Sequence, residues 1–466
     1  MSTVRSENRK TDENRYEWRS MLMPVWISLV LIVLLPLSSC SQPEETPNAP
    51  TAAKAVADTT DGWGETVDNP GQIASLPESV GANDWSGFRG DSRDNHVSST
   101  SFATDWTANP PRELWRRRVG EAWSSFAVVG DYAFTQEQRG PNEVVVCYHA
   151  ETGDEIWINQ LAERFTETGR AGPRATPTFL DGKLYTQSGM GTLQCLNAST
   201  GEVSWARSVP TDSGAEVPQY GYASSPLVVD GLVIVFASGP DGKGVAAYNA
   251  EDGEVAWTSG AGTHGYTSGH LANLAGTDQV IFSSDIGVES FNPSDGIVLW
   301  KNEWATKINP RCVQPILLGN DSLVIGSAGG VGTRRLSISK SGDDWSVTED
   351  WQTTDFEPFT GDSVYHDGFI YGFNNRNLMC VDADSAEIRW KSKPYAGQVL
   401  LIPEMKMLLV LAENGMVKLI EANPEAEVEI AKLKAIAGKT FNHPVIANGR
   451  LFVRNGEEAA CFALAD

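Results

Sequence analysis

The sequence predicts an all-β protein, on three observations. Glycine, proline and tryptophan are abundant, with 44, 24 and 15 copies in 466 residues, which is typical of short strands joined by tight turns. Between the turn signals, apolar residues alternate with polar ones, as in strands that bury one face. A short phrase ending in tryptophan also recurs along the chain, so the strands belong to a repeated unit.

The repeated phrase is clearest in four places. It reads AETGDEIW at 150–157, ASTGEVSW at 198–205, AEDGEVAW at 250–257 and PSDGIVLW at 293–300. The segment TPTFLDGKLYTQSGMGTLQCLNASTGEVSW (176–205) divides into four alternating runs separated by Asp-Gly, Gly and Thr-Gly turns. One repeat therefore predicts one four-stranded antiparallel blade, and its last strand ends at the tryptophan.

The spacing of the repeats predicts the number of blades. Successive tryptophans lie 39 to 52 residues apart, which suits propeller blades of four strands. Six units end at Trp, and a seventh carries Ile430 instead. The last unit stops after three strands, and strand 111–120 has no three strands before it. Pairing the two completes an eighth blade without an open sheet edge, so we predict an eight-bladed β-propeller over 111–466.

The recurring tryptophans are expected to pack against the next blade, because one active site needs only a single copy. They are Trp115, Trp157, Trp205, Trp257, Trp300, Trp351 and Trp390. Cysteines recur ten residues before three of them and at the matching place in the last blade, which predicts small, reduced, buried packing residues rather than disulfides. These are Cys147, Cys195, Cys380 and Cys461, and Cys312 stands apart.

The phrase A-x-x-[TD]-G-E-x-x-W and the eight units resemble the pyrroloquinoline-quinone (PQQ) propeller repeat, over about 111–466. The family contains two groups. One is the quinoprotein alcohol dehydrogenases, and the other is non-catalytic propeller lipoproteins such as the subunit of the outer-membrane β-barrel assembly machinery (BamB-like). The resemblance implies the fold and leaves the choice between catalysis and binding open.

The sequence favours the non-catalytic group. Quinoprotein dehydrogenases bind PQQ with an adjacent-Cys disulfide, a Ca²⁺ ion and an Asp base, and this chain has no Cys-Cys pair. His264 and His270 share one loop without a nearby Cys or acid, so we expect no metal, no quinone and no catalytic residue. The resemblance implies a protein-binding scaffold at the cell envelope, in outer-membrane protein assembly. The alternatives are a PQQ-dependent oxidoreductase, and carbohydrate or peptide binding at the channel mouth.

Residues 1–40 predict an export signal. Five basic residues precede the apolar run 21–37, which leads into Ser-Ser-Cys40. The pattern resembles the bacterial lipoprotein signal and implies that Cys40 is lipidated. Ser41 after it favours an outer membrane, facing the periplasm. The alternative is an uncleaved inner-membrane signal anchor, because the apolar run is nearly long enough to span a bilayer.

Two segments separate the signal from the propeller. Residues 41–83 are rich in Pro, Thr, Ala and acids and poor in large apolar residues, which predicts a disordered tether. Residues 84–110 are not propeller repeat and form a lead-in. In its first part, 84–99, Trp85 and Phe88 are expected to dock on the ring, and Arg89 and Arg93 to pair with acids.

The charge of the chain limits its partners. Loss of residues 1–40 removes five basic and four acidic side chains, so the formal charge of −24 becomes −25. Nucleic acid and anionic lipid surfaces need a basic patch, so neither is expected as a partner. Solubility alone explains such acidity, whereas a cationic protein is the more specific alternative. We expect a monomeric propeller.

Loop lengths predict a binding face. The first and third turns of each blade are short, whereas the second turns and the connections between blades are long and polar, as in 136–143, 158–175, 206–223 and 301–312. The candidate contacts on that face are aromatic and arginine residues, the types that dominate binding hot spots. They are Trp123, Arg139, Arg174, Tyr220, Tyr222, Trp304 and Arg311. Alternatively, Arg174 and Arg311 satisfy loop carbonyls and the aromatic residues plug the central channel.

Overall fold

The computed structural model describes most of the chain beyond the predicted tether: residues 69–70, 73, 75–98, 100–166, 171–306 and 311–465. The predicted signal with Cys40, and most of the predicted tether, lie outside the described residues. Residues 69–70, 73 and 75–83 of the tether are described, and Ile73 among them is 4% exposed. In the described part, no helix is both long and apolar enough to cross a membrane.

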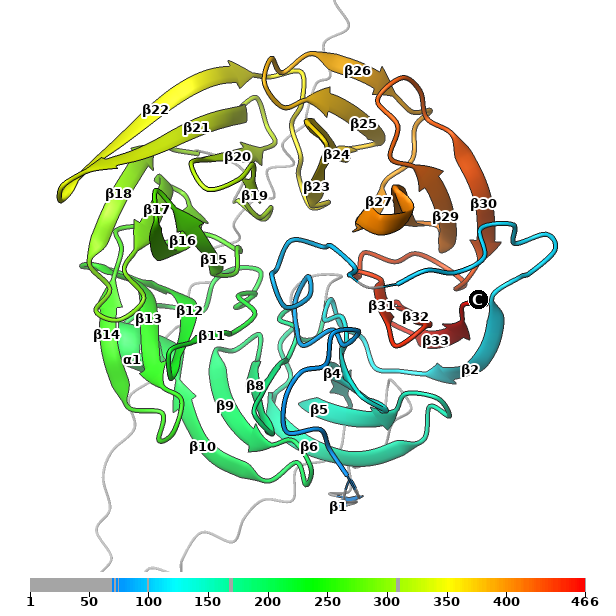
Figure 1. Ribbon diagram of the computed structural model, residues 1–466. Helices are drawn as coiled ribbons and strands as arrows, with labels where there is room; N and C mark the ends of the chain where they lie inside the picture. Colours follow the sequence, from blue (N-terminus) through cyan, green and yellow to red (C-terminus); the bar gives the residue numbers. More distant parts are fainter. Residues whose placement is uncertain are drawn as a thin grey trace, which may run out of the picture. The chain divides into compact units, whose positions relative to one another are not determined.

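Eight antiparallel sheets surround a central axis, as Figure 1 shows. Each blade contributes four strands, the first nearest the axis and the last at the rim. This arrangement confirms the predicted eight-bladed propeller. Blades are numbered here from the sheet that begins at Ala127.

The first four blades follow the chain order. Blade 1 is β3 (Ala127–Val129), β4 (Tyr132–Arg139), β5 (Asn142–His149) and β6 (Glu155–Glu163), with β1 (Asn69–Pro70) paired to β6. Blade 2 is β7 (Thr178–Leu180), β8 (Lys183–Gln187), β9 (Thr192–Asn197) and β10 (Val203–Ser208), followed by helix α1 (Val209–Ser213). Blade 3 is β11 (Leu227–Val229), β12 (Leu232–Gly239), β13 (Lys243–Asn249) and β14 (Val255–Ser259). Blade 4 is β15 (His270–Leu274), β16 (Thr277–Ser284), β17 (Gly287–Phe291) and β18 (Val298–Glu303).

The other four blades complete the ring. Blade 5 is β19 (Ile316–Leu317), β20 (Ser322–Ser327), β21 (Gly332–Ser341) and β22 (Asp344–Thr353). Blade 6 is β23 (Ser363–His366), β24 (Phe369–Asn374), β25 (Asn377–Asp382) and β26 (Ile388–Lys391). Blade 7 is β27 (Gly397–Ile402), β28 (Met407–Ala412), β29 (Met416–Glu421) and β30 (Glu429–Lys434), with the short helix η1 (Pro403–Met405) after β27. Blade 8 is β31 (Val445–Ala447), β32 (Arg450–Arg454), β33 (Glu458–Ala463) and β2 (Arg112–Arg118).

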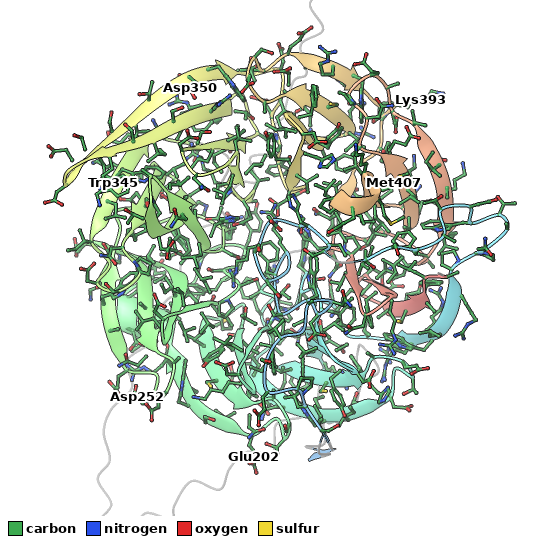
Figure 2. The ribbon with its side chains drawn as sticks, viewed as in Figure 1. Glu202, Asp252, Trp345, Asp350, Lys393 and Met407 are labelled. Atoms are coloured by element: carbon green, nitrogen blue, oxygen red, sulfur yellow. The ribbon has the colours of Figure 1, made fainter. Side chains whose placement is uncertain are left out.

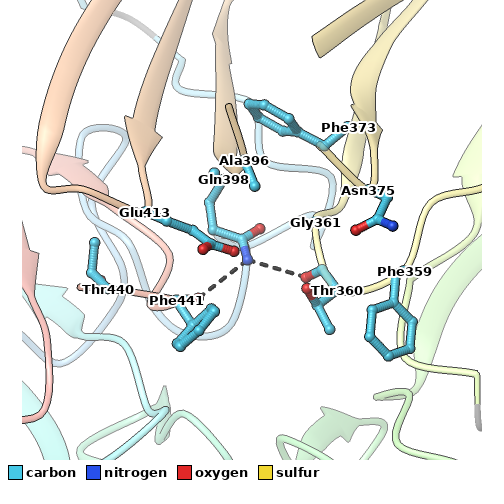
Figure 3. A pocket seen from close by; sticks show the side chains of 11 residues that line it. Phe359, Thr360, Gly361, Phe373, Asn375, Ala396, Gln398, Glu413, Thr440 and Phe441 are labelled. Carbon is cyan, nitrogen blue, oxygen red and sulfur yellow. Dashed lines mark hydrogen bonds between the residues drawn. The ribbon is translucent and has the colours of Figure 1, made fainter. Parts of the chain in front are cut away.

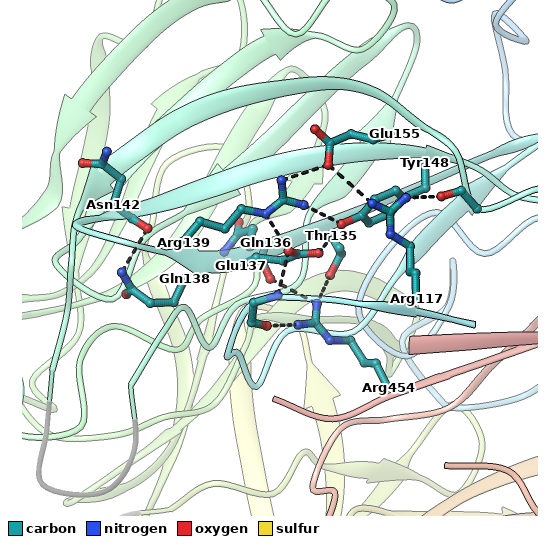
Figure 4. A network of polar contacts seen from close by, with 12 residues as sticks. Arg117, Thr135, Gln136, Glu137, Gln138, Arg139, Asn142, Tyr148, Glu155 and Arg454 are labelled. Carbon is teal, nitrogen blue, oxygen red and sulfur yellow. Dashed lines mark hydrogen bonds and ion pairs between the residues drawn. The ribbon is translucent and has the colours of Figure 1, made fainter. Parts of the chain in front are cut away.

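Blade 8 closes the ring as the sequence predicts. Its outer strand β2 comes from the beginning of the propeller and pairs with β33, where Trp115 lies opposite Cys461. Arg454 of β32 then joins blade 8 to blade 1, because its guanidinium donates to Thr135 Oγ1 at 2.6 Å and to Gly120 O at 2.8 Å. Figure 4 shows this contact beside a second buried group, in which Glu137 accepts from the Tyr148 hydroxyl at 2.6 Å. The closing seam is therefore a buried polar network as well as a strand pair.

The repeat tryptophans join neighbouring blades. The Trp157 indole at the end of blade 1 donates to Ala198 O of blade 2 at 3.1 Å. Six of the seven tryptophans make this bond to the next blade, at 2.8–3.1 Å: Trp115 to Ala150, Trp157 to Ala198, Trp205 to Ala250, Trp257 to Pro293, Trp351 to Ala383 and Trp390 to Asn423. The first residue of the repeated phrase is the acceptor in the first four pairs. Each of the first three copies of the phrase thus supplies the donor to the following blade through its Trp and the acceptor for the preceding blade through its first residue.

The turn glycine of the phrase is required by the same contact. Gly201 has φ 73°, and a Cβ there would lie 2.6 Å from the Trp157 ring. Gly153, Gly253 and Gly296 repeat this closeness to Trp115, Trp205 and Trp257 at 2.7, 2.7 and 2.5 Å. A residue with a side chain would push the indole away from its carbonyl, so the Thr-Gly or Asp-Gly turn serves packing as well as chain reversal.

Trp300 is the exception among the seven. Its indole donates to Gln279 Oε1 of its own blade. In the next blade, β21 and β22 are ten residues each and their turn lies far out on a projecting hairpin, visible in Figure 1 and marked by Trp345 and Asp350 in Figure 2. The usual turn carbonyl is therefore not beside Trp300.

The recurring cysteines share the buried face with the tryptophans. Cys147 pairs across the strands with Trp157, Cys195 with Trp205 and Cys380 with Trp390. These three cysteines and Cys461 are buried, and none of them forms a disulfide among the described residues. A thiol is small enough to leave room for the neighbouring indole.

The lead-in crosses the axis on the face that carries the first and third turns of the blades, called here the turn face. Trp85 is 3% exposed and bridges to Val128 of blade 1, and Leu401 N of blade 7 donates to Asn95 O at 2.9 Å. Figure 1 shows this segment in blue across the centre of the ring. The lead-in thus closes one end of the channel.

The two lead-in arginines have different partners. Arg89 lies beside an acid, with 3.5 Å between its Nε and Asp362 Oδ2. Arg93 does not pair with an acid, contrary to expectation. Its guanidinium donates instead to Ser225 O at 3.1 Å and Gly269 O at 3.0 Å, and also to Pro226 O and Thr178 Oγ1. The reason is that these acceptors converge where inner strands of blades 2 to 4 begin, and a guanidinium has enough donors for all of them.

A matched pair of glycine variants tests the contact between blades. Gly201→Ala should lower the free energy of unfolding by about 3 kcal/mol, because overpacking against Trp157 adds to the strain of positive φ. Gly182→Ala has the same φ of 73° but open space around its Cβ, so about 1 kcal/mol is expected. Urea unfolding of both variants measures the difference. Equal losses would show that the indole does not constrain the turn.

Candidate functional site

A cavity of about 280 Å³ opens at the axis on the opposite face, called here the loop face, where the connections between blades converge. We call this cavity the funnel. Six aromatic side chains form much of its wall: Phe88, Trp123, Tyr220, Tyr266, Phe359 and Phe441. They come from the lead-in and from connections spread around the ring, so only the closed propeller brings them together.

The aromatic wall is held by ring contacts. Trp123 and Phe441 stack across the seam between blades 8 and 1, with centroids 4.8 Å apart and planes at 13°. Tyr220 and Tyr266 meet edge to face at 5.6 Å, and the Tyr266 hydroxyl accepts from Tyr220 N at 3.2 Å. Burial raises the pKa of Tyr266 to about 12, so its phenol is neutral. Phe359 is 37% exposed, which leaves a large apolar surface at the mouth.

The floor of the funnel rests on the lead-in. Phe88 meets the His443 ring edge to face at 5.2 Å. Burial lowers the pKa of His443 to about 4, despite the Asp362 carboxylate 3.7 Å away, so the imidazole is neutral at pH 7. Asp362 also lies beside Arg89, which places one ion pair below the floor.

A small hollow adjoins the funnel, shown in Figure 3. Gln398 of β27 donates there to Thr360 O and to Phe441 O, both at 3.1 Å. The hollow has a volume of about 10 Å³, which is room for a water molecule at most. Its role is to tie two connections that carry funnel residues to the rigid blade 7.

Two larger hollows have other linings. A groove of about 390 Å³ on the loop face shares Trp123 and Phe441 with the funnel and adds Glu121, Lys439 and Glu457. A cavity of about 480 Å³ on the turn face lies beside the lead-in and includes His270. Burial and the neighbouring arginines lower the pKa of His270 to about 3, so it is neutral. Within the described residues, no group of three or more His, Cys, Asp and Glu side chains could hold a metal ion.

Three of the seven predicted contact residues line the funnel: Trp123, Arg174 and Tyr220. Arg174 stacks over the Phe165 ring, 4.5 Å from its centroid, and donates to Gly172 O. The prediction that this face binds a ligand remains a prediction for these three residues.

The structure places the other four predicted residues inside the protein. Arg139 is 4% exposed and bonds Glu137 and Glu155 at 3.0 and 2.8 Å, as Figure 4 shows. It lies at the end of β4, which the sequence assigned to a loop. Tyr222 is 2% exposed, and its hydroxyl donates to Ala237 O.

Arg311 and Trp304 form an interior pair. Arg311 is fully buried and donates to Ser284 O and Trp304 O, with its guanidinium 4.7 Å from the Trp304 ring. Arg311 therefore satisfies loop carbonyls, the alternative that the sequence left open. Neither side chain lines the funnel.

Several funnel residues were not predicted. Tyr266, Phe359, Phe441 and His443 all lie in connections between blades. Their common signal is an aromatic or imidazole side chain just before the first strand of a blade. Counting such residues at every junction, instead of only in the longest loops, would have found them.

The closed ring of PQQ-type repeats defines a PQQ-like propeller of eight blades. The family model for outer membrane protein assembly factor BamB matches residues 103–221 and 141–392, and the chain belongs to this family. The outer membrane protein assembly factor BamB of Yersinia pestis is 23% identical over 367 residues, which cover 74% of this chain and 77% of that protein.

Solved structures show the same fold at low identity. BamB from Moraxella catarrhalis is similar with a TM-score of 0.53 and 13% identity, over 76% of this chain and 99% of that one. The quinohemoprotein alcohol dehydrogenase ADHIIG from Pseudomonas putida HK5 has a TM-score of 0.57 and 12% identity, over 84% and 83%. A BamB protein and an alcohol dehydrogenase thus share this architecture, and the fold does not separate them.

One buried carboxyl supports the funnel wall from behind. Glu143 of β5 is fully buried and accepts from Gly189 N at 2.8 Å. Burial raises the pKa of Glu143 to about 7, opposed by that bond and by Arg174. Because the pKa of Glu143 in the folded protein lies above its ordinary value of 4.5, the folded state binds the proton more tightly than the unfolded state, and stability falls as pH rises from about 4.5 to 7.

Glu143→Gln should remove this loss of stability. At pH 8 the variant is expected to be more stable than the wild type by on the order of 3 kcal/mol, and near pH 4.5 the difference should vanish. Urea unfolding across this pH range measures it. Glu163→Gln, at an exposed site of the same blade, is the control. A pH-independent effect of Glu143→Gln would contradict the titration.

Proposed function

We propose that this protein is a non-catalytic scaffold that binds protein partners during outer-membrane protein assembly. Membership of the assembly-factor family, over 103–392, is the observation that carries the proposal. The named relatives from Yersinia pestis and Moraxella catarrhalis support it, because both are described as BamB.

The funnel gives such a scaffold a place to bind. Its aromatic wall is rigid, since Trp123 and Phe441 stack on each other and Gln398 ties Phe441 to blade 7. Aromatic side chains in a preformed depression dominate protein-binding hot spots. At about 280 Å³, the funnel is at the lower end of ligand pockets, a size that suits a large side chain better than a whole cofactor.

The proposal includes the absence of quinone and Ca²⁺. The sequence lacks the adjacent cysteines that pack on PQQ in the dehydrogenases, and the cysteine of the funnel wall, Cys312, forms no disulfide among the described residues. The purified protein is therefore expected to show no quinone absorbance and no PQQ-stimulated dye reduction with alcohols. Either signal would favour the oxidoreductase alternative.

The proposed location is the periplasmic side of the outer membrane, with Cys40 as the lipid anchor. The family description and the lipoprotein-like signal support it. A signal anchor in the inner membrane is the competing location. Labelling with radioactive palmitate and membrane fractionation distinguish the two, because Cys40→Ser should abolish labelling only for a lipoprotein.

Loss of the funnel aromatics should impair assembly. The double variant Trp123→Ala and Phe441→Ala, expressed in a deletion strain, is expected to leave less folded β-barrel protein in the outer membrane, read as heat-modifiable bands. Trp345→Ala on the distant β21–β22 hairpin is the control, since it removes a Trp outside the funnel. Photo-crosslinking from position 123 should capture an envelope protein. Normal barrel levels together with no crosslink would overturn the scaffold proposal.

A further inference from the structure

The funnel contains no acidic residue among its described lining. The chain has 60 acidic side chains and a formal charge of −24. Yet the 17 described residues that line the funnel include Arg174 and two histidines and neither Asp nor Glu. In so acidic a protein, this lining places no carboxylate against a bound anion, and the buried Asp362 below the floor lies beside Arg89, 3.5 Å from its Nε.

The floor of the funnel offers two hydroxyl donors. Ser225 Oγ accepts from Thr176 N, and Ser268 Oγ accepts from Ser225 N, both at 2.9 Å. Each oxygen is therefore engaged as an acceptor, and its proton is left to donate. Both serines line the funnel. Two adjacent hydroxyl donors suit the paired oxygens of a carboxylate.

A buried positive charge lies directly behind these serines. Arg93 is 6% exposed and donates to the carbonyls of Ser225 and Gly269, at 3.1 and 3.0 Å. All of its acceptors are neutral, so no carboxylate bonded to it cancels its charge. Burial and the charge of Arg89 lower the pKa of Arg93 to about 9, which leaves it positive at pH 7. Because the protein interior has a low dielectric constant, the electric field of the Arg93 charge reaches the funnel.

The wall opposite the donors is apolar. Trp123, Phe441 and the partly exposed Phe359 form a surface on which an aromatic or aliphatic group can pack. The funnel thus combines an apolar wall, hydroxyl donors and an underlying cation. A neutral sugar uses the wall and the hydroxyls but gains nothing from the charge.

We propose that the funnel binds a carboxylate that is attached to an aromatic or apolar group of a polypeptide. The apolar group packs on the Trp123–Phe441 stack, and the carboxylate accepts hydrogen bonds from Ser225 and Ser268 above Arg93. This inference rests on the proposed function as a protein-binding scaffold and specifies the chemistry of the bound segment. The carboxylate belongs either to a chain end or to an acidic side chain.

Small peptides test the charge requirement directly. The full-length protein in detergent is titrated calorimetrically with N-acetyl-phenylalanine, with N-acetyl-aspartyl-phenylalanine amide and with neutral N-acetyl-phenylalanine amide. The first carries a chain-end carboxylate and the second a side-chain carboxylate. One of them should bind at least about tenfold more tightly than the neutral amide. Equal affinity for all three, or binding of none, overturns the inference.

Variants locate the site. Ser225→Ala with Ser268→Ala, and separately Arg174→Gln, should each weaken carboxylate binding about tenfold and leave the neutral amide unchanged. Lys393→Gln removes an exposed charge outside the funnel and should bind as the wild type does. Circular dichroism checks that the variants fold. Unchanged carboxylate binding in both funnel variants contradicts the assignment.

The two proposals fail in different ways. If the peptide titration shows no preference for a carboxylate but position 123 still crosslinks to an envelope protein, the carboxylate inference is wrong and the scaffold proposal stands. Carboxylate preference without any effect of the funnel variants on barrel levels supports the site and removes the role in assembly.

Discussion

The hydrogen bond that six of the seven repeat tryptophans donate to the next blade is the contact on which the ring depends. A four-stranded blade cannot bury both of its faces alone, so it is stable only against its neighbours. The indole of Trp157 supplies apolar area and a donor to Ala198 O at once, and Gly201 gives it room. Such a bond contributes about 1 kcal/mol, and burial of the ring adds more. Because the contact is repeated at six of the blade boundaries, these modest contributions together hold the ring rigid.

That frame is closed at one end and open at the other. The lead-in bonds to inner strands of several blades and blocks the channel on the turn face. The long connections meet at the loop face and form the funnel there. Binding is therefore confined to one face by the same segment that fastens the ring. The lead-in also carries Arg93, the buried cation behind the funnel floor. This residue therefore serves both the fold, through its hydrogen bonds to the inner strands, and the proposed binding, through its charge.

The interior of this acidic protein is rich in arginine. Arg89, Arg311 and Arg454 are among the largest fully buried side chains, and each bonds to carbonyl or hydroxyl oxygens of the ring. A guanidinium can satisfy several unpaired carbonyls where strands of different blades meet. Its fixed charge also shapes the potential inside the channel. This explains how the funnel differs from the acidic exterior.

The sequence by itself determined the all-β class, the eight blades, the closing strand and the positions of the tryptophans, because each is a local pattern repeated at a fixed spacing. Trp123, Arg174 and Tyr220 could be assigned to the correct face from loop length. Tertiary structure alone decided that Arg139, Tyr222, Trp304 and Arg311 are interior. It also decided that Phe88, Phe359 and Phe441 meet at one funnel. Whether a loop side chain is buried, and which loops meet at the funnel, depends on contacts between residues far apart in the chain. The periodicity within one repeat carries no information about such contacts.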